Sequence, residues 1–180
     1  MRKLRWQQMA SLDGFMEGPN RELDWFVIDD EFGEYILEMF KTVDAIVFGR
    51  ATWQMMAGYW PTSKQPEAPM MNNLPKLVFS RTLKSVDGWQ NSRLARGAVE
   101  EEVASLKRQP GKDIAVFGST DLASTLLRLR LIDEIHIFLN PVVLGRGHPL
   151  FTDLKEKLSL KLLSARAFRS GSVLLRYQPA

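Results

Sequence analysis

Apolar side chains recur at helical spacing in three segments of the chain. The most regular stripe runs through residues 29–43 and predicts an amphipathic helix that packs on a sheet, with Asp29 or Asp30 as its N-cap. A narrower stripe predicts a second helix over residues 98–108, before a Pro-Gly pair that ends it. A third helix is expected around residues 122–129.

Short apolar runs rich in branched side chains alternate with these helices and predict strands. They lie at residues 44–49, 76–80, 113–118 and 133–139. Such runs are typical of a largely parallel sheet covered on both faces. Two further runs flank a turn at residues 169–171 and predict a C-terminal antiparallel hairpin, whereas the proline-rich, aperiodic residues 61–75 predict a loop. The pattern therefore predicts a single α/β domain over residues 1–180 with a mixed, mostly parallel sheet.

Composition and charge narrow the class of protein. Hydrophobic residues make up 45% and charged residues 25%, as in ordinary globular proteins, and no apolar run approaches the roughly 18 residues that span a bilayer. Gln7, Gln8 and Asp13 interrupt the N-terminal segment where a signal peptide needs an apolar stretch, so a cytoplasmic location is expected. The net charge of +3 is spread along the chain, which favours a small anionic ligand over nucleic acid.

The chain contains no cysteine, which excludes disulfides, thiolate catalysis and the cysteine-ligated zinc of nucleobase deaminases. The two histidines suggest neither a catalytic triad nor a metal site, because His136 lies inside a predicted strand and His148 lies in a glycine-rich loop. No metal is therefore expected.

Two strands run into a glycine after which a helix begins at once. AIVFG leads through Gly49 into RATWQMM, and IAVFG leads through Gly118 into STDLASTLL. A helix start presents unpaired backbone N–H groups, and glycine lets the backbone approach a phosphate closely. Each junction is a candidate phosphate site, although such turns also occur as plain connections. Neither matches the GxGxxG or GxxxxGK[ST] motif.

Side chains at the strand ends strengthen this interpretation. Arg50 and Thr52 follow the first glycine, and Ser80 and Arg81 end a further strand. A guanidinium group binds phosphate oxygens in pairs, and ligands of open α/β sheets gather at the carboxyl ends of strands. The alternative is that these are solvated loop residues.

The same residues carry a family resemblance. VFGRATW resembles the glycine-arginine-x-threonine element of dihydrofolate reductases, and VFSRT resembles their serine-arginine element. Residues 114–151, together with SLDGF after the first strand, resemble the reductase domain of the riboflavin-pathway deaminase-reductase, and the likeness spans roughly residues 3–177. The resemblance implies a dihydrofolate reductase-like three-layer fold, with helices flanking the central sheet.

The resemblance also implies an NADPH site built from the candidate residues. The expected contacts are Gly49, Arg50 and Thr52 for the adenosine-side phosphates, Ser80 and Arg81 for the 2′-phosphate, and Gly118, Ser119 and Thr120 for the pyrophosphate. Related proteins usually carry two glycines where this chain has Gly118 and Ser119, and in dihydrofolate reductases that pair forms a cis peptide.

The function implied by the resemblance is NADPH-dependent reduction of a pyrimidine- or pteridine-like heterocycle, similar to 5-amino-6-(5-phosphoribosylamino)uracil reductase of riboflavin biosynthesis. A dihydrofolate reductase and a non-catalytic NADP(H)-binding protein of the same fold are the alternatives. A homodimer is expected by analogy, with contact through the 133–139 strand and the terminal hairpin.

The acceptor side is less clearly marked. Asp13, in the SLDGF element, is the candidate catalytic residue, although Asp13 and Gly14 also fit a plain turn. Dihydrofolate reductases carry their acid on the first helix, where Asp30 is the weaker candidate and Glu31, Glu34 and Glu38 belong to a solvated face. Five aromatic residues could form either a flat wall for the acceptor ring or part of the core: Trp25, Phe26, Trp53, Tyr59 and Trp60. A phosphate of the substrate could be bound by Arg21, Lys64 or Arg146.

Overall fold

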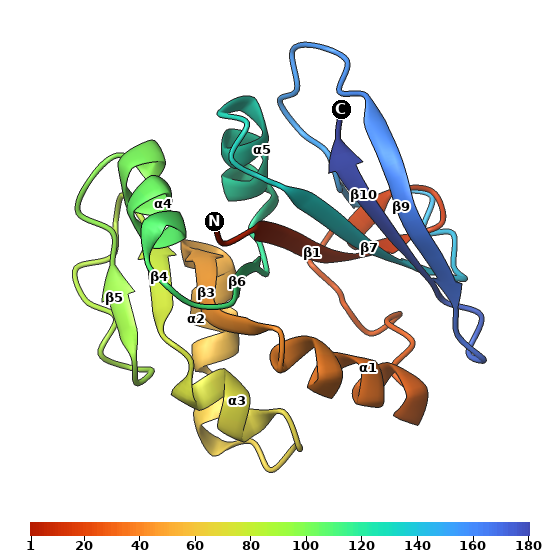
Figure 1. The fold of residues 1–180 in the computed structure, drawn as a ribbon. Helices are drawn as coiled ribbons and strands as arrows, with labels where there is room; N and C mark the ends of the chain where they lie inside the picture. Colours follow the sequence, from red (N-terminus) through yellow and green to blue (C-terminus); the bar gives the residue numbers. More distant parts are fainter.

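A computed structural model describes residues 1–180 and contains an eight-stranded sheet with helices on both faces (Figure 1). The strand order is β5-β4-β3-β6-β1-β7-β10-β9. The strands from β5 to β7 pair in parallel, and β10 pairs antiparallel with both of its neighbours, β7 and β9. Strand β9 therefore runs in the same direction as the parallel strands, and β10 alone is reversed. The predicted α/β class, with a mostly parallel sheet and a C-terminal antiparallel hairpin, is confirmed.

The elements alternate along most of the chain. The strands of the main sheet are β1 (Leu4–Ser11), β3 (Val43–Gly49), β4 (Lys76–Phe79), β5 (Ser92–Leu94), β6 (Asp113–Val116), β7 (Glu134–Asn140), β9 (Leu160–Ala167) and β10 (Val173–Pro179). The helices are α1 (Asp30–Phe40), α2 (Arg50–Ala57), the 3-10 helix η1 (Trp60–Thr62), α3 (Ala68–Asn73), α4 (Val99–Arg108) and α5 (Thr120–Arg128). A separate two-stranded ribbon pairs β2 (Phe15–Glu17) with β8 (His148–Pro149). No helix has the length and apolar character needed to cross a membrane.

Alternating side chains of the central strands build two cores. In β3, Ala45 and Val47 pack into the core under α4 and α5, whereas Ile46 and Phe48 pack into the core under α1, α2 and α3. All four side chains are buried. A strand covered on both faces has no polar face, which is why the run DAIVFG is continuously apolar after its first residue. Three layers result, as Figure 1 shows.

Helix α1 begins where the sequence predicts and ends earlier. Asp29 is its N-cap, and the Asp29 carboxylate accepts the N–H of Phe32 at 2.8 Å. The apolar stripe continues to Val43, but Val43 already belongs to β3. The residues that extended the predicted helix therefore belong to the following strand.

The prediction that residues 61–75 form a loop is wrong in part, because this segment contains most of η1 and all of α3. A helix of six residues has little stability of its own. It is held in place because Ala68 and Met71 are buried, and Met71 joins the core under α1 and α2. Pro69 stands in the first turn of α3, where a missing N–H costs little.

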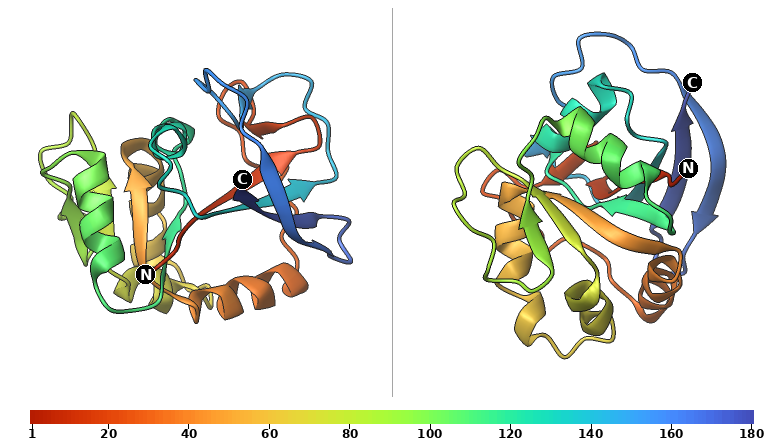
Figure 2. Two further views of the ribbon diagram at one scale, coloured as in Figure 1. Left: turned by 45° about the horizontal axis from the view of Figure 1, so that its top comes forward. Right: turned by 60° about the vertical axis from the view of Figure 1, so that its left-hand side comes forward.

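The predicted dimer contact needs a correction. Strand β7 lies between β1 and β10, and its residues are almost all buried within the monomer, so it offers no surface to a second copy. Strand β9 is instead the outer edge of the sheet, and Figure 2 shows the hairpin at the periphery. Leu162 and Leu163 of β9 are 51% and 40% exposed. Of the two predicted contact segments, only the β9–β10 hairpin has surface available for contact with a second copy.

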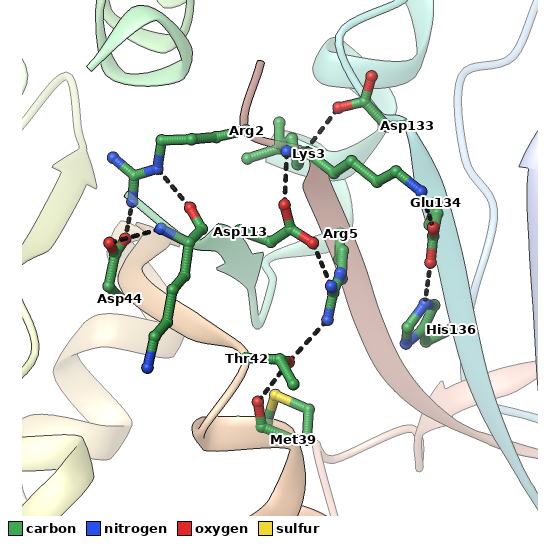
Figure 3. A network of polar contacts seen from close by, with 12 residues as sticks. Arg2, Lys3, Arg5, Met39, Thr42, Asp44, Asp113, Asp133, Glu134 and His136 are labelled. Atoms are coloured by element: carbon green, nitrogen blue, oxygen red, sulfur yellow. Dashed lines mark hydrogen bonds and ion pairs between the residues drawn. The ribbon is translucent and has the colours of Figure 1, made fainter. Parts of the chain in front are cut away.

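Ion pairs connect the strands at the amino-terminal edge of the parallel sheet (Figure 3). Arg5 of β1 pairs with Asp113 of β6, and Lys107 of α4 pairs with Asp133 at 2.6 Å. Arg2, just before β1, pairs with Asp44 of β3. The charges that link neighbouring strands therefore gather at one end of the sheet.

Glu134 of β7 is the most heavily bonded carboxylate at this edge. It contacts Lys3 at 2.7 Å, His136 at 2.8 Å and Arg176 at 3.1 Å. Burial raises the pKa of Glu134, but these hydrogen bonds outweigh it and bring the pKa to about 2. Burial lowers the pKa of His136, whose Nε2 lies 2.8 Å from Oε2 of Glu134. Both residues thus serve the packing of β1, β7 and β10.

Candidate cofactor and substrate cleft

A cleft of about 1460 Å³ opens at the carboxyl-terminal edge of the parallel strands, opposite the ion pairs. The end of β3 and the segments that follow β4 and β6 all reach it. The predicted cofactor residues that line the cleft are Gly49, Arg50, Thr52, Ser80, Arg81, Ser119 and Thr120. Gly118 lies directly behind them, since its carbonyl oxygen accepts the N–H of Gly49 at 2.8 Å. The structure therefore brings all eight residues together.

The two glycine junctions are packed too closely to admit side chains. A Cβ on Gly49 would lie 2.6 Å from Oγ and 2.9 Å from N of Ser119. Gly118 has a φ of +110°, and its Cβ would lie 3.0 Å from Oγ1 of Thr52. The Gly118–Ser119 peptide is cis. Glycine is thus required at both positions by close backbone approach, and at Gly118 also by its backbone angle.

Both helices that start at these junctions have open N-termini. The N-cap residues of α2 and α5 are Gly49 and Ser119, and neither provides a side-chain hydrogen bond to the first turn. Helix α1, which Asp29 caps, shows the ordinary arrangement. Uncapped first-turn N–H groups at a cleft are suited to an anionic oxygen. Asp121 is the one acidic residue in the two first turns.

Two guanidinium groups in the cleft have no acidic partner. Neither Arg50 nor Arg81 has a carboxylate within 4.0 Å, and the only side-chain contact is Arg50 Nη1 to Oε1 of Gln54 at 3.2 Å. The Oγ of Ser80 accepts N–H groups of its own turn, from Thr82 at 3.1 Å and Leu83 at 2.9 Å, so its proton remains available to a ligand. Open N–H groups, free guanidinium groups and close-packed glycines together fit the phosphates of a dinucleotide.

An apolar wall forms another part of the cleft. Phe32, Ile36 and Phe40, one helical turn apart on α1, face it together with Phe117 and Phe138. Sequence patterning placed the α1 residues in the core but did not identify them as a binding surface. Of the predicted ring-binding aromatics, Phe26, Tyr59 and Trp60 line the cleft, whereas Trp25 does not and Trp53 is buried in the core.

Gln7 is a cleft residue that sequence reasoning did not assign to the site. It lies in β1 beside Gln8, and both side chains line the cleft. The available signal was a pair of adjacent uncharged amides in the middle of the strand. Such a pair is unusual in a strand that is buried on both faces.

Asp13 lies outside the residues that line the cleft. Its carboxylate accepts hydrogen bonds from Oγ of Ser11 at 2.7 Å and from the backbone N–H groups of Leu144 at 3.1 Å and Gly145 at 2.7 Å. The Ser11 hydroxyl and these N–H groups hold the pKa of Asp13 below its usual value. Asp13 thus ties the end of β1 to the loop before β8, and its catalytic role stays a prediction.

The other charged candidates are scattered. Glu31 faces away from the cleft and contacts Arg166 at 3.1 Å, and Asp30, Glu34 and Glu38 are exposed outside the cleft. Arg21 lines the cleft, Lys64 lines a separate small hollow, and Arg146 lines neither. Only Arg21 among the three phosphate candidates therefore reaches the site.

Comparison with known proteins assigns the family. A family model described as the RibD C-terminal domain matches residues 2–174. The chain belongs to the RibD C-terminal domain family. Within the curated proteins, Bacillus subtilis (strain 168) YyaP, itself uncharacterized, is 36% identical over 173 residues, which cover 93% of this chain and 90% of YyaP.

Solved structures agree on the fold of this RibD C-terminal domain. A Shewanella sp. PV-4 protein whose name places it in riboflavin biosynthesis superposes with a TM-score of 0.80 at 24% identity, covering 99% of both chains. Dihydrofolate reductase from Enterococcus faecalis, solved with NADP(H), gives a TM-score of 0.66 at 14% identity and covers 98% of this chain and 96% of its own. The predicted dihydrofolate reductase-like fold is confirmed.

Proposed function

We propose that this protein is an NADPH-dependent reductase that transfers a hydride to a pyrimidine- or pteridine-like heterocycle. The observation that carries the proposal is the contact between Gly49 and Gly118, which joins two uncapped helix starts in a cleft that the unpaired Arg50 and Arg81 also line. Membership of the RibD C-terminal domain family supports a reductase. The NADP(H) complex of a dihydrofolate reductase with a similar fold supports the cofactor.

Different residues of the chain would bind different phosphates of NADPH. The N–H groups that begin α2 and α5 would hold the adenosine-side phosphates and the pyrophosphate, with Thr52 and Thr120 as hydroxyl donors. Arg81 and Ser80, at the end of β4, would hold the 2′-phosphate. When bound, the nicotinamide supplies the hydride, so the protein needs to orient the acceptor and keep water out.

True dihydrofolate reduction is not the activity we propose. Helix α1 presents Phe32, Ile36 and Phe40 to the cleft, and its acidic residues lie elsewhere. An acid on the first helix, as the resemblance to dihydrofolate reductases requires, is therefore missing from the cleft. A reductase that needs no such carboxylate fits the site better.

Binding of NADPH can be tested by thermal unfolding. At a ligand concentration about a hundred times Kd, binding adds about 2.7 kcal/mol, which raises Tm by roughly 5–10 °C in a protein of this size. We expect this rise with NADPH and a much smaller one with NADH. In the R81A variant the NADPH affinity should fall roughly tenfold or more, because a charge-assisted hydrogen bond is lost, while NADH affinity stays unchanged.

The control is R108A, which removes an exposed arginine at the far end of α4, outside the cleft. It should leave the NADPH shift intact. No Tm shift with NADPH in the wild-type protein would overturn the cofactor assignment. Oxidation of NADPH is then followed with 5-amino-6-(5-phosphoribosylamino)uracil and with dihydrofolate. Oxidation with dihydrofolate would contradict the inference that the cleft lacks the acid needed for dihydrofolate reduction.

A further inference from the structure

Gln7 is a largely buried residue whose side-chain amide forms no hydrogen bond within the protein. Its backbone belongs to the β1 ladder opposite His136, and only 8% of the residue is exposed. The side chain forms no hydrogen bond within the chain, yet it lines the cleft. Its amide oxygen and nitrogen are therefore open to the cleft and available to a bound molecule. A ligand that enters the cleft is the natural partner for this amide.

Gln7 has the imidazole of His136 beside it in β7 and apolar side chains toward α1. It shares a face of β1 with Met9, which lies opposite Phe138 of β7. Met9, Phe138, Phe32 and Ile36 pack together on the α1 side of the sheet, and all four line the cleft. A planar ring fits against such a wall, because aromatic and thioether side chains pack well on ring faces.

Several charged groups also line the cleft. Arg50 and Arg81 belong to the phosphate end, and Arg128 belongs to α5, which covers the opposite face of the sheet. Glu67, at the start of α3, lies beside α1, since its Oε1 is 3.9 Å from the position of a Cβ on Gly33. Gln7 itself offers a neutral donor and a neutral acceptor side by side.

We propose that Gln7 selects the acceptor of the proposed reductase by pairing with a neutral ring that carries adjacent C=O and N–H groups. The proposal rests on the function proposed above and adds the residue that recognises the acceptor ring by hydrogen bonds. The NH2 group of Gln7 donates to the ring carbonyl while its carbonyl oxygen accepts the ring N–H, and the ring lies against Met9 and Phe138. Such two-point pairing rejects rings that lack either group, because the amide then stays unpaired in the protein.

The test uses two probes that differ only at the ring edge. Lumazine (2,4-dioxopteridine) carries the C=O and N–H pair, and 1,3-dimethyllumazine carries methyl groups in place of the ring N–H groups. Affinities are measured by calorimetry with and without saturating NADPH. We expect the wild-type protein to bind lumazine at least tenfold more tightly than the dimethyl compound, and the Q7L variant to bind both alike.

Controls separate a local effect from misfolding and from failure of the cofactor assignment. Q7L replaces the amide by an apolar group of similar size and should keep the NADPH-dependent rise in Tm and a wild-type Tm or higher. Q109L, at the exposed end of α4, should keep the preference for lumazine.

Equal binding of the two probes by the wild-type protein, no binding of lumazine, or a preserved preference in Q7L would each overturn the proposal. Loss of the NADPH shift with the probe preference intact would instead refute the reductase and leave the role of Gln7 standing.

Discussion

Replacing Glu134 by glutamine tests how much the ion pairs at the amino-terminal edge stabilise the fold. The carboxylate is held by Lys3, His136 and Arg176, and its side chain is only 5% exposed. Its pKa falls from an ordinary 4.5 to about 2, and at about 1.36 kcal/mol per pH unit this difference corresponds to about 3 kcal/mol of stability at neutral pH. Glutamine keeps the shape of the side chain and removes the charge.

The sign of the pH dependence follows from the direction of the pKa change. Because the pKa of Glu134 is lowered in the folded state, its stabilisation is complete above pH 4.5 and is lost as the pH falls toward 2. At pH 7 we expect E134Q to unfold at a urea concentration roughly 1.5 M lower than the wild-type protein, for an m-value of about 2 kcal/mol/M. By pH 3 the difference in unfolding free energy should fall to less than half.

Urea unfolding from pH 7 to pH 3 measures both proteins side by side, so titration of the other carboxylates cancels in the difference. E34Q is the matched control, since Glu34 is exposed on α1 and forms no ion pair, and it should follow the wild-type protein at every pH. A free-energy difference for E134Q that is the same at pH 7 and pH 3 would refute the reasoning.

Three further substitutions test other parts of the structure. G49A places a Cβ 2.9 Å from the backbone N of Ser119 and should lower Tm and abolish the NADPH shift, whereas G58A, whose Cβ has only contacts of 3.5 Å or more, should do neither. K76M removes a buried ammonium that bonds three backbone carbonyls, and urea unfolding should show a loss of roughly 2 kcal/mol or more; an unchanged midpoint would contradict this. If the homodimer forms through β9, light scattering should give a dimer for the wild-type protein and a monomer for L162K, and a monomeric wild-type protein would contradict the expectation.

Local patterns predicted the elements whose stability is decided by their own residues. The run DAIVFG is apolar throughout its buried length, and Asp29 caps α1 through a contact three residues away, so both were visible in the sequence. Helix α3 was not predicted, because the prolines of residues 61–75 suggest a loop and the stability of α3 comes from burial of Met71 against distant residues. The short edge strand β5 likewise depends on its pairing with β4.

The residues of the candidate site likewise differ in whether a local sequence signal identifies them. Gly49 and Gly118 were identified because a glycine between a strand and a helix is a local signal. The wall residue Phe32 and the amide of Gln7 were not assigned, since a binding role depends on which groups the fold leaves facing the cleft and without a partner. The absence of a partner is a property of the folded chain and has no signature in a single sequence.

The hydrogen bond between Gly49 and Gly118 fixes the spacing of the two helix starts. A molecule that spans both of them meets a prearranged pair of contacts, and once one half is bound the other is held at a high effective concentration. Two fragments obtained by cutting a dinucleotide at its pyrophosphate gain nothing from this arrangement, even when both are present. The same hydrogen bond thus makes the protein bind an intact dinucleotide more tightly than its two separate halves.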